Sequence, residues 1–394
     1  MTLWREMSSV SLSRGSSREV SPWRRCSQRA VTAPRTVLEA LFCVLLPLGA
    51  PAMIAAYLVG AYRPDPFRLD GKYFPDGGFL FDLHVMWQAG HDVVTGHSPY
   101  PFVYPAPAAF LMAPFGALPW DVAVAAFTLT LVGALVLALR LLDVRDWRCY
   151  ALALASMPMA SSLMIGTLSP LLALGAAAAW RYRDRRFAVA IAIVAVVVTK
   201  IFLWPLVIWL VATRRFRTAA TTVALGIGVT LVSWAALGFD GLRDYGHGLQ
   251  RVAGLVQETS YSPFALLRLL GLSTPSARLV VTALTLAALG GIILVARGRD
   301  GDRRSFVLAL ATGFLASPIV WMHYLVVVFV PLGLYRPRLG AAWLIPLAYW
   351  GLQTQENQGS AAKIVVMFVL TGLAVTLSMW QRRERLPVPA LSSP

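Results

Sequence analysis

Long apolar runs that begin and end beside arginine constrain this chain more than any other feature. Residues 150–180, 187–213 and 305–335 are three such runs. A single helix of that length would end on the opposite side of a membrane, which places one arginine cluster outside, against the positive-inside tendency. Each run is therefore predicted to form a hairpin of two short helices. Each half, of about 13 to 15 residues, reaches about 20 Å, so the turns must be shielded from lipid by protein.

The overall composition supports a membrane protein rather than a soluble one. Hydrophobic residues make up 57% of the chain and charged residues only 14%, and the mean hydropathy is +0.64. The net charge of +16 does not predict nucleic-acid binding, because the arginines cluster at the ends of apolar runs. Cys26, Cys43 and Cys149 are scattered, so neither a disulfide framework nor a zinc site is indicated.

The remaining chain organises around a single membrane domain, residues 37–380. Residues 1–36 are rich in serine and arginine and are predicted to be a disordered cytoplasmic tail, as is the tail 381–394. Residues 40–62 are predicted to form a retained first spanning helix rather than a removed signal peptide. Two outer loops are expected at residues 63–119, with interfacial helices, and 238–275. Further membrane segments are predicted at residues 122–142, 219–237, 278–296, 339–352 and 364–380.

These segments predict an all-α bundle of about 12 membrane segments with both termini in the cytoplasm. Residues 104–119 contain four prolines, so they are interpreted as a re-entrant or interfacial piece rather than a crossing.

Lys200 is the first candidate for a functional residue. It is one of only three lysines and lies within the apolar sequence VAVVVTKIFLWPLV. An ionisable group at that depth costs about 2.5 to 3.5 kcal/mol and needs a partner or an aqueous cavity. The alternatives are snorkelling to the interface and a phosphate partner at the hairpin turn.

His323 is similarly surrounded by apolar residues in SPIVWMHYLVVV. It is either a hydrogen-bonded packing residue or part of a site that binds a phosphate and a sugar ring. The predicted turns carry further polar candidates for sugar or acceptor binding: Thr167, Ser169, Ser317, Trp321 and Tyr324.

Asp82 lies in the acidic first outer loop, in FLFDLHVMWQAG. Most loop aspartates are solvated charges or helix caps, but this one is expected to face the cationic turns. A carboxylate within reach of an acceptor hydroxyl serves as a general base, and Asp82 is the best-placed candidate. His84, Trp87 and Tyr104 are weaker candidates for sugar or acceptor binding, with interfacial anchoring as the alternative for the aromatic residues.

The acidic pair in Asp300-Gly301-Asp302 has the pattern of a metal-binding motif of nucleotide-sugar enzymes. It lies in a basic cytoplasmic linker, apart from the other polar clusters, and is interpreted as chance composition. No phosphate-binding glycine loop or metal-ligand spacing is evident, so no metal or cofactor is predicted.

Four segments in order resemble glycosyltransferase family 87, the DUF2029 group of the GT-C superfamily. They are FDLHVMWQAGHDVVTGHSPY with YPAPAAFLMAPFGALP, IGTLSPLLALGAAAAWRYRDRR, VTKIFLWPLVIWLVATRRFR and SPIVWMHYLVVVFVPLGL. The resemblance implies a GT-C-like bundle in a bacterial plasma membrane, with the active site facing outside. Thr167 stands where the family commonly has glutamine.

The resemblance further implies inverting transfer of a mannose-like hexose or a pentose from a polyprenyl-phosphate donor to a glycolipid or glycan acceptor. Asp82 would be the base, and Lys200, His323 and Arg251 would hold the donor phosphate. The alternatives are a transporter or lipid-linked sugar flippase, which half-helices with polar turns also suit, and a structural partner in an envelope complex. No inverted repeat supports a transporter.

Overall fold

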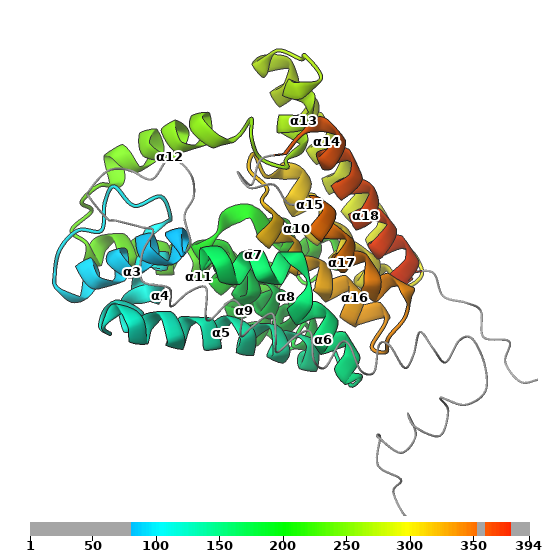
Figure 1. The fold of residues 1–394 in the computed structure, drawn as a ribbon, viewed down its shortest axis with the longest axis horizontal. Coiled ribbons are helices and arrows are strands. Elements are labelled where there is room, and N and C mark those ends of the chain that lie inside the picture. The colour runs from blue at the N-terminus through cyan, green and yellow to red at the C-terminus, as the bar shows by residue number, and fades with distance from the viewer. Residues whose placement is uncertain (1–79, 353–358, 380–394) are drawn as a thin grey trace, which may run out of the picture. The chain divides into compact units, whose positions relative to one another are not determined.

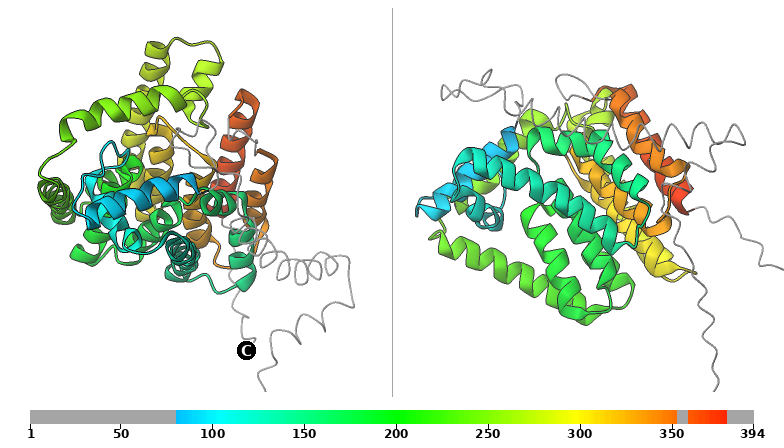
Figure 2. Two further views of the ribbon diagram at one scale, coloured as in Figure 1. Left: turned by 60° about the vertical axis from the view of Figure 1, so that its left-hand side comes forward. Right: turned by 60° about the horizontal axis from the view of Figure 1, so that its bottom comes forward.

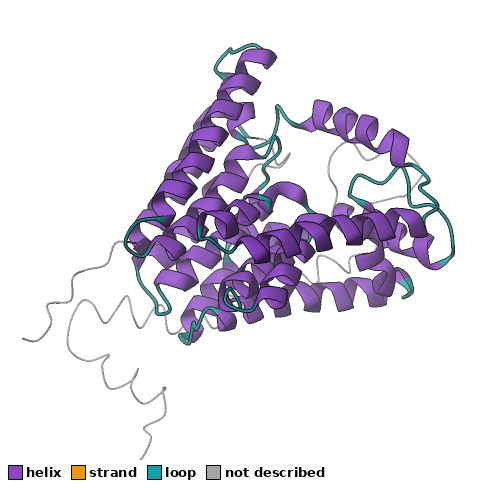
Figure 3. Ribbon diagram, turned by 180° about the vertical axis from the view of Figure 1, so that it is seen from behind, coloured by secondary structure: helices purple, strands orange, loops and turns teal. Residues whose placement is uncertain are grey.

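The computed structural model describes residues 80–352 and 359–379, and these residues form helices and connecting turns without a strand (Figure 3). The predicted first helix, residues 63–79 of the first outer loop and both tails lie outside the described residues. In chain order the α-helices are α3 (Phe81–Val94), α4 (Ala106–Gly116), α5 (Trp120–Leu141), α6 (Trp147–Ala155), α7 (Met157–Ile165), α8 (Ser169–Arg181), α9 (Arg186–Thr199), α10 (Pro205–Ala212), α11 (Phe216–Ala236), α12 (Leu242–Val256), α13 (Pro263–Leu269), α14 (Thr274–Ala296), α15 (Gly301–Ala316), α16 (Phe329–Tyr335), α17 (Ile345–Ala348) and α18 (Ala361–Met379). The 3-10 helices are η1 (Ile201–Leu203), η2 (Met322–Val328), η3 (Ala341–Leu344) and η4 (Tyr349–Leu352).

Four helices within the described ranges are long and apolar enough to cross a membrane: α5, α11, α14 and α18 (Figure 1). They match four of the predicted membrane segments, which confirms that these residues form apolar helices of spanning length. Most of α14 is exposed, and Leu279 and Leu294 keep 71% and 67% of their surface uncovered. Apolar side chains on such a face are accommodated by lipid.

The helices break at the three predicted hairpin turns. Gly166 ends α7 with a φ of 74°, a left-handed conformation that glycine adopts without a steric cost. Lys200 has extended backbone between α9 and η1, and residues 317–321 separate α15 from η2. The number of about 12 segments and the path of each hairpin through the membrane stay predictions.

Helices α3 and α4 pack with their backbones in direct contact (Figure 2). A Cβ atom on Gly90 would collide with the carbonyl oxygen of Met112, and one on Gly116 would collide with the backbone of Gly90 and His91. The His91 Nδ1 atom lies 3.0 Å from the carbonyl oxygen of Gly116. This close pairing holds the buried face of α3 in a defined rotation, with Asp82 at its first turn.

The predicted second outer loop, residues 238–275, contains two helices, α12 and α13, rather than irregular structure alone (Figure 1). Helix α12 has no buried residue. Its apolar residues recur at the spacing of one helical face, an amphipathic pattern suited to a membrane interface; they are Leu242, Tyr245, Leu249, Val252 and Val256.

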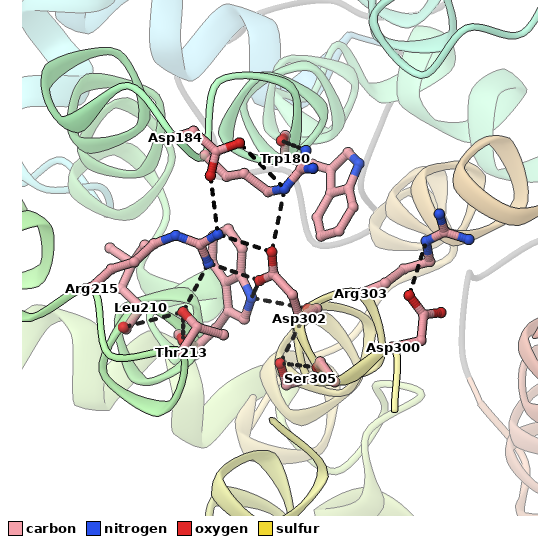
Figure 4. Close-up of polar contacts among 12 residues, drawn as sticks. Trp180, Asp184, Leu210, Thr213, Arg215, Asp300, Asp302, Arg303 and Ser305 are labelled. Atoms are coloured by element: carbon pink, nitrogen blue, oxygen red, sulfur yellow. Dashed lines mark hydrogen bonds and ion pairs between the residues drawn. The ribbon is translucent and has the colours of Figure 1, made fainter. Parts of the chain in front are cut away.

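The interpretation of Asp300-Gly301-Asp302 as an isolated linker was wrong for Asp302, which joins three basic linkers (Figure 4). The Arg215 guanidinium donates to both Asp302 carboxylate oxygens at 2.8 and 2.9 Å. Arg183 lies 3.3 Å from the same carboxylate, and the Trp209 indole donates to it at 3.0 Å. The charge pattern placed these linkers on one side of the membrane, but their pairing depends on the packing of α10 against α15.

The glycine at position 90 should be essential for the pairing of α3 with α4. We expect Gly90→Ala to lower the free energy of unfolding by about 1–3 kcal/mol, because the methyl group meets backbone that cannot rotate away. Thermal unfolding of the purified protein in detergent measures the effect. Gly133→Ala in α5 is the matched control, since nothing lies within 4 Å of its Cβ position, and equal stability of the two variants would contradict the packing.

Loss of the Asp302 charge should loosen the contacts among the three arginine-rich linkers. We expect Asp302→Asn to lower the free energy of unfolding by about 1–2 kcal/mol, a value reduced by partial solvent exposure. Asp300→Asn is the control, because Asp300 makes only one long contact, 3.9 Å to Arg303. A thermal shift no larger for Asp302→Asn than for Asp300→Asn would show that the ion pairs contribute nothing.

Candidate active site

Four segments that are distant in the sequence meet around the start of α3. The Leu80 amide donates to the carbonyl oxygen of Met164 at 2.7 Å, and Leu83 touches the turn at Gly166 so closely that a Cβ atom there would collide with it. Helix η2 packs against α7 and α8. The turn after Lys200 packs against α15, where a Cβ atom on Gly313 would lie 2.6 Å from the carbonyl oxygen of Phe202. These contacts bring Asp82, Lys200 and the start of η2 together.

Asp82 lies on the first turn of α3 and is partly exposed. The Tyr104 hydroxyl donates a hydrogen bond to its Oδ2 atom at 3.3 Å. Burial raises the pKa of the Asp82 carboxyl above its ordinary value, while the Lys200 charge and the Tyr104 hydrogen bond lower it in part. A carboxylate with a raised pKa is a stronger base than a solvated one.

Lys200 places its ammonium group among aromatic rings. The Nζ atom lies 3.9 Å from the ring centroid of Tyr324 and 5.7 Å from that of Tyr104, which are cation–π distances. In the described part of the chain no carboxylate comes within ion-pair distance of Nζ, so the interaction with Asp82 acts across a gap. The ammonium therefore keeps donors for a further group.

His323 follows at the first turn of η2 and is only 2% exposed. Neither ring nitrogen has a hydrogen-bond partner among the described residues. Its ring lies 4.9 Å from that of Tyr324, which in turn stacks on Phe202 at 5.2 Å. An unpaired buried nitrogen is costly, which favours a site completed by a ligand over a simple packing role.

The hydroxyl-bearing residues predicted at the turns form bonds within those turns. Thr167 donates to Ser169 at 3.1 Å, and both are fully buried. Ser317 donates to the carbonyl oxygen of Ile319. Trp321 is partly exposed where η2 begins. The Thr167 hydroxyl also accepts from the Ser169 amide, so Thr167 and Ser317 bond to backbone at the helix breaks, whereas the Ser169 hydroxyl accepts from Thr167.

The structure does not bring His84, Trp87 or Arg251 into contact with this cluster. The Trp87 indole donates to the carbonyl oxygen of Leu118 at 3.1 Å, and His84 packs against Trp87 and Trp120. Arg251 is exposed on α12, and no hydrogen bond or ion pair is found for it within residues 80–352. Their predicted binding roles stay predictions.

A hollow of about 410 Å³ lies elsewhere, beside α12 and α14. Its lining contains no member of the cluster; it consists of Gln250, Ala253, Gly254, Gln257 and Arg278. The polar cluster, rather than this hollow, is therefore the candidate active site.

Sequence reasoning missed two features of the site. The Tyr261 amide donates to the carbonyl oxygen of Val320 at 2.7 Å and its hydroxyl to that of Leu352 at 2.9 Å, so this buried residue holds the turn before η2. The bond between Tyr104 and Asp82 was also missed. Neither has a local sequence signal, because both depend on the packing of distant segments.

Comparison with known proteins identifies the class to which this helical bundle belongs. The profile of glycosyltransferase family 87 matches residues 102–318. A polyprenol-phosphate-mannose-dependent alpha-(1-2)-phosphatidylinositol pentamannoside mannosyltransferase of Mycobacterium tuberculosis (strain CDC 1551 / Oshkosh) is 27% identical over 356 residues, covering 80% of this chain and 77% of the relative. No solved structure matches the chain.

The fold and these findings define a membrane glycosyltransferase. The chain belongs to glycosyltransferase family 87. Lys200 lies inside the matched residues, whereas Asp82 lies before them and His323 just after. The family membership confirms the resemblance drawn from the sequence segments. The roles of the individual side chains stay predictions.

Proposed function

We propose that this protein transfers mannose from a polyprenyl-phosphate donor to a hydroxyl group of a glycolipid acceptor on the extracytoplasmic face. The mannosyltransferase relative supports the donor and the lipid class of the acceptor. The single observation that carries the proposal is the meeting of the Asp82 carboxylate with an ammonium and an imidazole that lack ion-pair and hydrogen-bond partners among the described residues.

Asp82 is the general base in this proposal. Its carboxylate takes the proton of the acceptor hydroxyl while the hydroxyl oxygen attacks the anomeric carbon. The new bond from oxygen to carbon forms as the bond from the anomeric carbon to the donor phosphate breaks. The proton ends on Asp82, and the leaving group is the polyprenyl phosphate.

Lys200 and His323 receive that phosphate. The negative charge on the leaving phosphate oxygen grows in the transition state, so a fixed ammonium stabilises the transition state more than the bound donor. The neutral imidazole of His323 supplies one N–H donor. Arg251 adds a further phosphate contact if α12 approaches the cluster when the donor binds.

A single displacement inverts the anomeric configuration. Among the described residues the cluster contains one carboxylate. Retaining enzymes that form a covalent intermediate use a second carboxylate beside the first, so this arrangement favours inversion. Trp87, Trp321 and Tyr324 are proposed as surfaces for the sugar rings, and His84, Thr167, Ser169 and Ser317 as residues that shape the acceptor side.

The proposed orientation places the start of α3 outside and both termini in the cytoplasm. It follows from the arginine-rich linkers that Asp302 joins, since positive clusters remain on the cytoplasmic side. Labelling of single cysteines at Thr95 and at Arg299 with a membrane-impermeant maleimide in intact cells tests it.

Removal of the proposed base should abolish transfer. We expect Asp82→Asn to reduce kcat by at least about 100-fold, because the amide cannot accept the proton, with donor affinity largely retained. Transfer of radiolabelled mannose from polyprenyl-phosphate-mannose to phosphatidylinositol mannosides in nanodiscs measures it. Asp92→Asn is the matched control on the same helix, where the carboxylate accepts only from Gln88. An active Asp82→Asn enzyme would refute the proposed base.

Removal of the proposed phosphate partner should weaken donor binding and slow transfer. We expect Lys200→Ala to raise the KM for polyprenyl-phosphate-mannose about 10-fold or more, because one charge-assisted hydrogen bond to the donor is lost. The variant should also lower kcat. Lys363→Ala on α18 is the control lysine and should match the wild type. An unchanged KM and kcat for Lys200→Ala would remove Lys200 from the site.

The acceptor class can be tested separately. Wild-type enzyme with the labelled donor should label glycolipids that carry a free sugar hydroxyl and leave phosphatidylinositol itself unlabelled. Movement of the labelled donor across a vesicle membrane without any transfer product would instead support a lipid-linked sugar flippase.

A further inference from the structure

We propose that Tyr104 is a positioning residue that holds the Asp82 carboxylate apart from Lys200 and leaves its Oδ1 atom free for the acceptor hydroxyl. The inference rests on the proposed function, because it concerns how the base is kept in its active state. The prediction that Tyr104 contributes to sugar or acceptor binding stays a prediction.

Tyr104 contacts both charged groups. Its hydroxyl donates to Asp82 Oδ2 at 3.3 Å, and its ring centroid lies 5.7 Å from Lys200 Nζ. Phe102 packs against the ring at 5.4 Å. Pro105 and the start of α4 follow immediately, so the main chain on its C-terminal side has little freedom. The side chain is thereby fixed from several directions.

Without such a spacer, an opposite charge pair in this setting should close. A carboxylate and an ammonium attract strongly where the dielectric constant is low, yet the structure shows no ion pair between Asp82 and Lys200. A closed pair would tie the carboxylate to the ammonium, weaken it as a base and occupy the donors meant for phosphate. The Tyr104 hydrogen bond occupies one carboxylate oxygen, and the Tyr324 ring holds the ammonium at 3.9 Å.

The charged and titratable groups around Asp82 are few. Tyr104, Lys200 and Tyr324 act on it directly, and His323 lies beyond Lys200. Helices α4 and α7, which pack against α3, carry no titratable side chain. Helix α5 carries Asp121 in its first turn and Arg140 in its last, and α3 itself adds His84, His91 and Asp92.

The test is the pH dependence of kcat/KM in Tyr104→Phe, which keeps the ring but removes the hydroxyl. The aromatic ring that remains in this variant still separates the carboxylate from Lys200, so only the hydrogen bond is lost. Loss of that hydrogen bond raises the pKa of Asp82. Transfer requires ionised Asp82, so activity is lost as pH falls through that pKa, and the acid limb should move up by about one pH unit. The KM for polyprenyl-phosphate-mannose should change less than about twofold, because the ring beside Lys200 remains.

Two further variants make the result specific. Tyr104→Gln keeps a hydrogen-bond donor and should move the acid limb back toward its wild-type position. It also provides the measurement if Tyr104→Phe does not fold. Tyr245→Phe is the control: it removes the hydroxyl of Tyr245, whose ring packs against Tyr100 and Trp234, and it should leave the pH profile unchanged.

The outcomes separate this inference from the proposed function. An unshifted acid limb in Tyr104→Phe, together with an inactive Asp82→Asn enzyme, overturns the role of Tyr104 and leaves the base in place. An active Asp82→Asn enzyme overturns the proposed base itself. Equal shifts in Tyr104→Phe and Tyr104→Gln show that the hydrogen bond is not the cause and also overturn the inference.

Discussion

The site depends on two opposite charges, Asp82 and Lys200, that lie close together without joining. Their attraction acts between half-buried side chains, where it is stronger than in water. Aromatic side chains occupy that space: Tyr104 bonds the carboxylate, and Tyr324 lies under the ammonium. A separated pair keeps one group basic and the other cationic, the combination that the proposed transfer from a phosphate donor uses.

The broken helices are the structural condition for this arrangement. A helix interrupted within a membrane exposes backbone groups that lipid cannot hydrogen-bond. Here the breaks lie against other protein segments: Gly166 touches Leu83, and Gly313, which has no side chain, leaves room for the backbone of the turn at Phe202. Thr167 and Ser317 supply hydrogen bonds at their own turns. These breaks also interrupt the helices at Lys200 and just before His323, which lets both side chains lie near the start of α3.

The arginine-rich linkers are held together by a different kind of charge contact. Asp302 accepts from Arg215 and lies beside Arg183, so the linkers between helices are joined where arginine is abundant (Figure 4). Helix α10 precedes one of these linkers and α15 follows another, and the two helices also flank the Lys200 turn. The ion pairs thus stabilise, from the far end, the helices that position a site residue.

The sequence by itself determined the class of protein, the four long spanning helices, the points where the shorter helices break and the three ionisable candidates. These features depend on local properties, namely the length of apolar runs, glycine and proline at turns, and the cost of an ionisable group among apolar neighbours.

Only the tertiary structure decided which polar groups meet. The bond from Tyr104 to Asp82 depends on the contact of α3 with α4 through Gly90 and Gly116, and the ion pairs of Asp302 depend on α10 packing against α15. Hydropathy and helical periodicity report how each segment meets its surroundings, whereas partners distant in the sequence are selected by how whole helices fit together.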